Sequence, residues 1–144
     1  MYYTNDTPQK GMTMEEQRAM KAQQLKTARQ LMTEEFAALL AVGPEENASW
    51  TGCMTDLMEA AHIAYMQGTI RNDEGRLCTF KELVDRVCLC MHVKVPRNPR
   101  GFAYTADRRK GVRQMPLIER YRWQMAHGKR KGLLAMVMAR QKKA

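Results

Sequence analysis

Two Thr-x-x-Glu motifs mark the starts of helices in this chain, and they constrain its fold more than any other local feature. At Thr13–Glu16 and at Thr79–Glu82, the hydroxyl and the carboxylate can each accept a hydrogen bond from a backbone N–H that a helix start leaves unpaired. Apolar residues spaced three and four apart follow each motif, which is the spacing of one helix face. The pattern predicts amphipathic helices that pack on one another.

The helix after the first motif is expected to be long. Leu25, Met32 and Leu39 recur at intervals of seven residues and, with their apolar neighbours, form a stripe along one side. Gly43-Pro44 should end this helix, because glycine accepts the left-handed conformation of a helix terminus and proline cannot continue the hydrogen-bond ladder. The stripe can pack on the rest of the chain or against a second copy, and the Met-rich tail offers another pairing surface. A homodimer is therefore one expected assembly.

Two further amphipathic helices are expected next. The second should begin near residues 49–52 and run to Gln67, with Gly68 as its C-terminal cap. Trp50 should anchor its start on the domain. The third, after the second Thr-x-x-Glu motif, should end near residues 92–93.

A short fourth helix is expected from Pro99 to Lys110. Asn98 suits the N-cap position, and proline suits the first helical position. Gly101 weakens this prediction, because glycine in a helix interior costs about 1 kcal/mol relative to alanine. The competing interpretation makes residues 102–105 a strand or a wing.

Two shorter helices complete the expected fold. Pro116 should restart a helix that runs to Ala126, with Leu117 and Tyr121 facing inward. The apolar residues 133–138 should form a short helix that docks on the domain.

The expected class is all-α, a compact helical domain with a helix-turn-helix-like unit and a long N-terminal helix. Its expected parts are a flexible N-terminus over residues 1–12, the long helix over 13–43, the helix-turn-helix-like domain over 49–127 and a basic C-terminal arm or helix over 128–144. A chain of 144 residues is long enough to bury a hydrophobic core in one such domain.

Charge is distributed very unevenly along the sequence. Residues 1–90 carry 9 Lys and Arg against 13 Asp and Glu, a net charge of −4, whereas residues 91–144 carry 15 against 2, a net charge of +13. A solvated surface usually mixes both signs, but here Asp107 is the only acid between Met91 and Gln114. Nucleic acid is the commonest partner with dense, regular negative charge, so the last third of the chain is expected to bind it.

The segment from Thr79 to Lys110 has the layout of a helix-turn-helix motif, with a tight turn before a cation-rich second helix. The second helix of such a motif lies in the major groove with its N-terminal residues at base edges. Arg100, Tyr104 and Arg108 recur every four residues and would share a face, on which Arg100 should contact a base or a nearby phosphate. Tyr104 suits DNA contact and core packing equally well. The residues expected to contact double-stranded DNA are Lys94, Arg97, Arg100, Tyr104, Arg108, Arg109, Lys110, Arg113 and, in the basic arm, Lys129, Arg130 and Lys131.

Two other functions fit the same charge pattern. An RNA-binding protein would use the basic tail as its main contact, and a protein-interaction module would dock its cationic end on an acidic partner. Double-stranded DNA is preferred because of the helix-turn-helix layout.

We expect no enzyme, cofactor or metal. The sequence lacks a Gly-rich phosphate loop and a nucleophile motif. Cys88, Cys90 and His92 alternate, but residues two apart on a helix point about 200° from one another, so they cannot converge on one ion. The cysteines are expected to be reduced and buried, and His62 should be a partly buried side chain without a catalytic role.

The chain is expected to be a cytoplasmic, nucleoid-associated bacterial protein. Its first residues lack the basic start and the apolar run of a secretion signal. No apolar stretch approaches the roughly twenty residues that a membrane helix needs, so no membrane contact is expected.

Residues 49–126 resemble the C-terminal region of RteC-type regulators. The residues that carry the resemblance are Trp50-Thr51-Gly52, Leu57-Met58-Glu59-Ala60-Ala61-x-x-Ala64-Tyr65-x-x-Gly68-x-Ile70, Phe80-Lys81-Glu82-Leu83 and Arg109-Lys110-x-x-Arg113 with Leu117. The resemblance implies a helical DNA-binding regulator involved in excision of bacterial conjugative transposons. The chain departs from the family pattern in its longer, more acidic turn at residues 71–75 and in the prolines at 96, 99 and 116.

Overall fold

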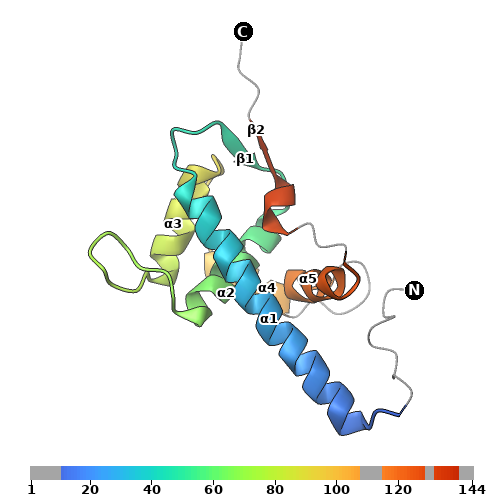
Figure 1. Ribbon diagram of the computed structural model, residues 1–144. Helices are drawn as coiled ribbons and strands as arrows, with labels where there is room; N and C mark the ends of the chain where they lie inside the picture. Colours follow the sequence, from blue (N-terminus) through green and yellow to red (C-terminus); the bar gives the residue numbers. More distant parts are fainter. Residues whose placement is uncertain (1–10, 108–114, 129–131, 140–144) are drawn as a thin grey trace.

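The computed structural model describes residues 11–107, 115–128 and 132–139. Over these ranges the elements are, in order, α1 (Met14–Ala41), β1 (Ala48–Trp50), α2 (Met54–Gln67), α3 (Phe80–Cys90), α4 (Pro99–Asp107), α5 (Leu117–Ala126), the 3-10 helix η2 (Leu133–Met136) and β2 (Val137–Ala139). Helices dominate, so the predicted all-α class is confirmed (Figure 1). A small two-stranded sheet adds to it.

α1 begins and ends where the sequence predicts. The Thr13 hydroxyl accepts a hydrogen bond from the Glu16 N–H (3.1 Å), and the Glu16 carboxylate accepts one from the Thr13 N–H (3.1 Å). Gly43 follows the last turn with a φ of +82°. The first half of α1 extends beyond the other helices, whereas its second half, from Ala28 on, packs against them (Figure 1).

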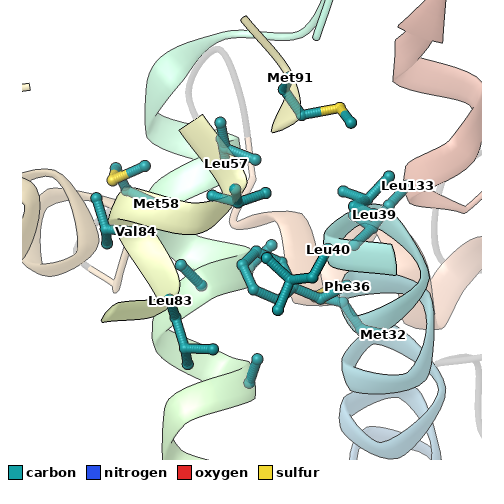
Figure 2. Close-up of a cluster of buried hydrophobic side chains, with 14 of the residues drawn as sticks. Met32, Phe36, Leu39, Leu40, Leu57, Met58, Leu83, Val84, Met91 and Leu133 are labelled. Carbon is teal, nitrogen blue, oxygen red and sulfur yellow. The ribbon is translucent and has the colours of Figure 1, made fainter. Parts of the chain in front are cut away.

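The core lies where the second half of α1 meets α2 and α3. Met32, Phe36 and Leu39 of α1 are fully buried. Figure 2 shows them beside side chains from the other elements, namely Leu57, Met58, Leu83, Val84, Met91 and Leu133. From Ala28 on, the apolar stripe of α1 therefore packs within its own chain, which is the first of the two arrangements expected for it.

α2 ends at the predicted cap, Gly68, which adopts the left-handed conformation. It begins later than expected, at Met54, because residues 48–50 form β1. Trp50 is buried, and its indole N–H donates a hydrogen bond to the Cys53 carbonyl (3.0 Å), so the predicted anchor precedes the helix. α3 has its capping box and ends at Cys90, slightly before the expected position.

The C-terminal segment differs from the short helix that was expected at residues 133–138. Its first residues form η2, and residues 137–139 then pair antiparallel with β1, so that Trp50 lies opposite Val137. The Thr51 N–H and hydroxyl both donate to the Met136 carbonyl, at 2.6 and 2.8 Å. These bonds join residues 85 apart, so local periodicity could not reveal them.

α4 is a helix, and the strand or wing interpretation of residues 102–105 is wrong. It packs mainly on α2, with Phe102 against the core. The expected continuation of α4 through residues 108–110 lies outside the described ranges. α5 has the predicted bounds and buries Leu117 and Tyr121. Within the described residues, none of these helices is long and apolar enough to cross a membrane.

Candidate nucleic-acid interface

Four predicted contact residues lie in α4 and on the segment that leads into it. Lys94 and Arg97 belong to that segment, and Arg100 and Tyr104 belong to the helix. All four are exposed, and Tyr104 is 61% exposed, so it does not complete the core. We call these four residues the α4 surface. The other predicted contacts lie outside the described residues, namely Arg108, Arg109, Lys110, Arg113, Lys129, Arg130 and Lys131.

Asn98 and Gly101 fix the first turn of α4. The Asn98 side-chain oxygen accepts a hydrogen bond from the Gly101 N–H (3.0 Å), as expected of an N-cap residue. A Cβ atom at position 101 would lie 2.5 Å from the Asn98 amide nitrogen. Glycine is therefore the residue that lets the Asn98 side chain fold over the helix end. The glycine that weakened the helix prediction is part of the cap.

The Arg100 side chain packs against an aromatic cluster. The Arg100 guanidinium carbon lies over the Phe80 ring, 5.3 Å from its centroid, which is within the range of a cation–π interaction. The Phe80 ring is itself held edge-on by His62 (5.7 Å) and Tyr65 (6.1 Å) of α2. Phe80 is 3% exposed, so its ring is held by packing in the domain.

A hollow of about 310 Å³ separates the start of α3 from the segment before α4. Its lining includes apolar side chains and the cations Lys81, Arg97 and Arg100. Asp85, the carboxylate in the lining, pairs with Lys81 at 2.7 Å. Among the described residues, Lys94, Arg97 and Arg100 form no ion pair. Within the described ranges, no carboxylate is therefore paired with these three positive charges.

The connection between α3 and α4 is longer than the tight turn that was expected. Residues 91–98 separate the two helices, whereas a helix-turn-helix motif has a turn of about three to four residues. The Trp50 N–H donates to the Met91 carbonyl (3.2 Å), which ties the beginning of this connection to β1. The N-terminal turn of α4, with its exposed Arg100, is positioned by α2, on which the helix packs, and by the Asn98 cap.

Two buried acids of α2 hold α5 in place. Glu59 accepts hydrogen bonds from the backbone N–H groups of Leu117 and Ile118, both at 2.9 Å. Asp56 pairs with the guanidinium of Arg120 at 2.5 Å. Burial raises the pKa of Glu59, although the two N–H donors act in the opposite direction. The sequence predicts no particular role for Glu59, and no local pattern reveals that it caps a helix 58 residues away.

Two cations of residues 91–144 therefore have a structural role inside the domain. Arg120 pairs with Asp56, as described above. Arg122 is 1% exposed, and it contacts Glu119 (3.2 Å) and the side chain of Gln24 (3.0 Å). A further internal contact comes from Glu35, which accepts hydrogen bonds from the Tyr121 hydroxyl and the Leu133 N–H. Among the described cations of residues 91–144, some thus form internal pairs and others lie on the exposed α4 surface.

The sulfur and imidazole groups have separate surroundings. Cys78, Cys88 and Cys90 are buried as expected, whereas Cys53 is exposed. Burial raises the pKa of the Cys88 thiol to about 11, so it is a weak nucleophile near neutral pH.

The two ring nitrogens of His92 lie 2.6 and 2.9 Å from the carbonyl oxygens of Ala48 and Pro44. In the described part of the chain, no group of three or more His, Cys, Asp or Glu side chains is arranged to hold a metal ion.

No protein-family model, curated protein or solved structure matches this chain. The resemblance to RteC-type regulators stays a prediction that depends on the residues quoted for it.

Proposed function

We propose that this protein binds double-stranded DNA through the α4 surface and regulates transcription or excision on a mobile element. The observation that carries the proposal is the group of exposed cations at the start of α4, none of which is paired with a carboxylate of the described chain. The proposed regulatory role on a mobile element is based on the resemblance of the motifs to those of RteC-type regulators. The mechanism is binding without a chemical step.

The DNA backbone would supply most of the affinity. Each Lys or Arg that neutralises a phosphate releases condensed counterions, and this release favours association at low salt. Lys94 and Arg97 lie outside regular secondary structure and are suited to such contacts. In the first turn of α4 the Arg100 side chain is exposed and the Asn98 side chain caps the backbone, which suits a helix end that approaches base edges.

The proposal is tested by measuring affinity for duplex DNA in competition with structured RNA and with an acidic polypeptide at the same ionic strength. We expect duplex DNA to compete best. Stronger competition by structured RNA would favour an RNA-binding protein, and stronger competition by the polypeptide would favour a module for an acidic partner. Either result would reject the proposed function.

The contribution of the α4 surface is tested with the variant Arg97→Ala/Arg100→Ala. Both side chains are exposed, so helicity should be retained while duplex affinity falls several-fold or more. The matched control is Arg71→Ala/Arg76→Ala, which removes the same charge from the loop between α2 and α3 and should change affinity less.

A further inference from the structure

We propose that Arg100 recognises guanine in the major groove, that Phe80 is the positioning residue for its guanidinium, and that Arg97 and Lys94 contact phosphates only. This inference rests on the proposed function and deepens it, because it assigns a base preference to one residue of the α4 surface.

The first argument is the position of Arg100 in the fold. It is the second residue of α4, directly after Pro99, and the Asn98 side chain caps the same turn. N-terminal residues of a recognition helix are the ones that reach base edges. Arg97 and Lys94 precede the helix, in a segment that contains Pro96 and has no regular structure. A side chain on such a segment can follow a phosphate but is poorly fixed relative to a base.

The second argument is the support of the guanidinium by an aromatic ring. The π-face of Phe80 is electronegative and attracts the cation, which lies 5.3 Å from the ring centroid. The ring cannot move away, because it is buried and packed against His62 and Tyr65. Restricting a long side chain before binding reduces the conformational entropy that is lost when it forms directional hydrogen bonds. Arg97 and Lys94 have no such support among the described residues.

The third argument is that the charge of Arg100 remains available. Asp85 lines the same hollow, but its carboxylate is paired with Lys81. Arg100 is therefore restrained by a π-face, which leaves its N–H groups without a carboxylate acceptor among the described residues. Arginine has five N–H donors in a planar fork that matches the O6 and N7 acceptors of guanine. This combination favours guanine over the other bases.

The experiment begins with selection from a randomised duplex library by the full chain. We expect a preferred site that contains guanine. Replacing that guanine with 7-deazaguanine removes the N7 acceptor and should reduce affinity about 5- to 100-fold for the wild-type protein. A wild-type protein that binds duplexes without any guanine preference would refute the inference and leave the proposed function intact. A protein that binds no duplex DNA would overturn both.

Two variants then assign the preference to residues. Arg100→Lys keeps the charge but loses the planar fork, so discrimination against 7-deazaguanine should decrease while the salt dependence of binding is unchanged. The matched control, Arg97→Lys, should alter neither quantity. Equal loss of discrimination in both variants, or in neither, would refute the assignment to Arg100.

Phe80 is tested with pentafluorophenylalanine at position 80, which keeps the shape of the ring and reverses the sign of its quadrupole. We expect an unchanged unfolding temperature, an unchanged salt dependence and a several-fold loss of guanine discrimination. A purely structural role for Phe80 would leave the discrimination unchanged. In that case Phe80 would not be the positioning residue.

Discussion

Whether the role of a single residue can be predicted from the sequence depends on how far along the chain its partners lie. The capping boxes at Thr13 and Thr79 are complete within four residues, so the sequence reveals them without any knowledge of the fold. Gly101 is also explained locally, by the Asn98 side chain three residues earlier. Glu59 is different, because its partners are 58 and 59 residues away, and no local pattern identifies it as a helix cap.

Gly101→Ala should destabilise the protein by about 1 kcal/mol, because the new Cβ atom would displace the Asn98 cap. In the background of Asn98→Ala the same change should stabilise the protein by up to about 1 kcal/mol, since alanine then has the higher helix propensity and no cap remains to be displaced. Urea denaturation of the four proteins of this cycle measures both values. The same destabilisation in both backgrounds would contradict the role assigned to Asn98.

Glu59→Gln should flatten part of the pH dependence of stability. The folded carboxyl has a raised pKa because of burial, so above the ordinary value near 4.5 the native state binds more protons than the unfolded state. The free energy of unfolding contributed by this group therefore decreases as pH rises through that window. Glutamine does not titrate. As pH rises, the free energy of unfolding of the variant should therefore increase relative to that of the wild type.

Chemical denaturation from about pH 4 to about pH 8 tests this sign. Glu74→Gln, at an exposed position of the α2–α3 loop, is the control for the removal of one carboxylate. A stability difference for Glu59→Gln that shifts toward wild type as pH rises would contradict the direction given for its pKa.

Among the elements, the helices could be predicted and the C-terminal pairing could not. Periodic apolar residues and caps predict α1, α3 and α5 with nearly their observed bounds. The strand at residues 137–139 exists because β1 supplies its partner, and a short apolar run does not distinguish a strand from a helix. The start of α4 at Pro99 was predicted, but the connection before it was wrongly described as a tight turn, because α3 ends at Cys90, before the predicted end at residues 92–93.

The Lys81–Asp85 pair on α3 should control how much positive potential the α4 surface presents. Asp85→Asn removes a negative charge from the hollow beside Arg97 and Arg100 and should raise duplex affinity about two- to fivefold at low salt. Lys81→Met should lower it, because Asp85 is then free to interact with those arginines. Fluorescence anisotropy with a labelled duplex gives both affinities.

Asp73→Asn removes the same charge from the exposed α2–α3 loop and is the matched control. It should change the affinity less than Asp85→Asn, and the differences should shrink at high salt because exposed charges are screened. An equal gain from both variants would mean that net charge alone matters and that the hollow has no particular role.

Over the described part of the whole molecule, cations without an ion-pair partner lie on the exposed side of α1 and at the start of α4, and the α4 group is the one in the strongly basic last third of the sequence. The charge counts alone could not show which basic residues are internal, and the structure removes Arg120 and Arg122 from the set available to a ligand. It leaves Lys94, Arg97 and Arg100 exposed. We therefore propose this surface as the one that binds duplex DNA.

The salt dependence of duplex binding tests that assignment, when it is compared between two variants of equal net charge. Lys94→Ala/Arg97→Ala/Arg100→Ala removes the cations of the α4 surface, and Lys21→Ala/Lys26→Ala/Arg29→Ala removes three exposed cations of α1. The α4 variant should reduce the slope of log affinity against log salt by about 0.9 for each phosphate that it no longer neutralises, whereas the α1 variant should keep the wild-type slope. Equal slopes for the two variants would contradict the assignment of DNA binding to the α4 surface.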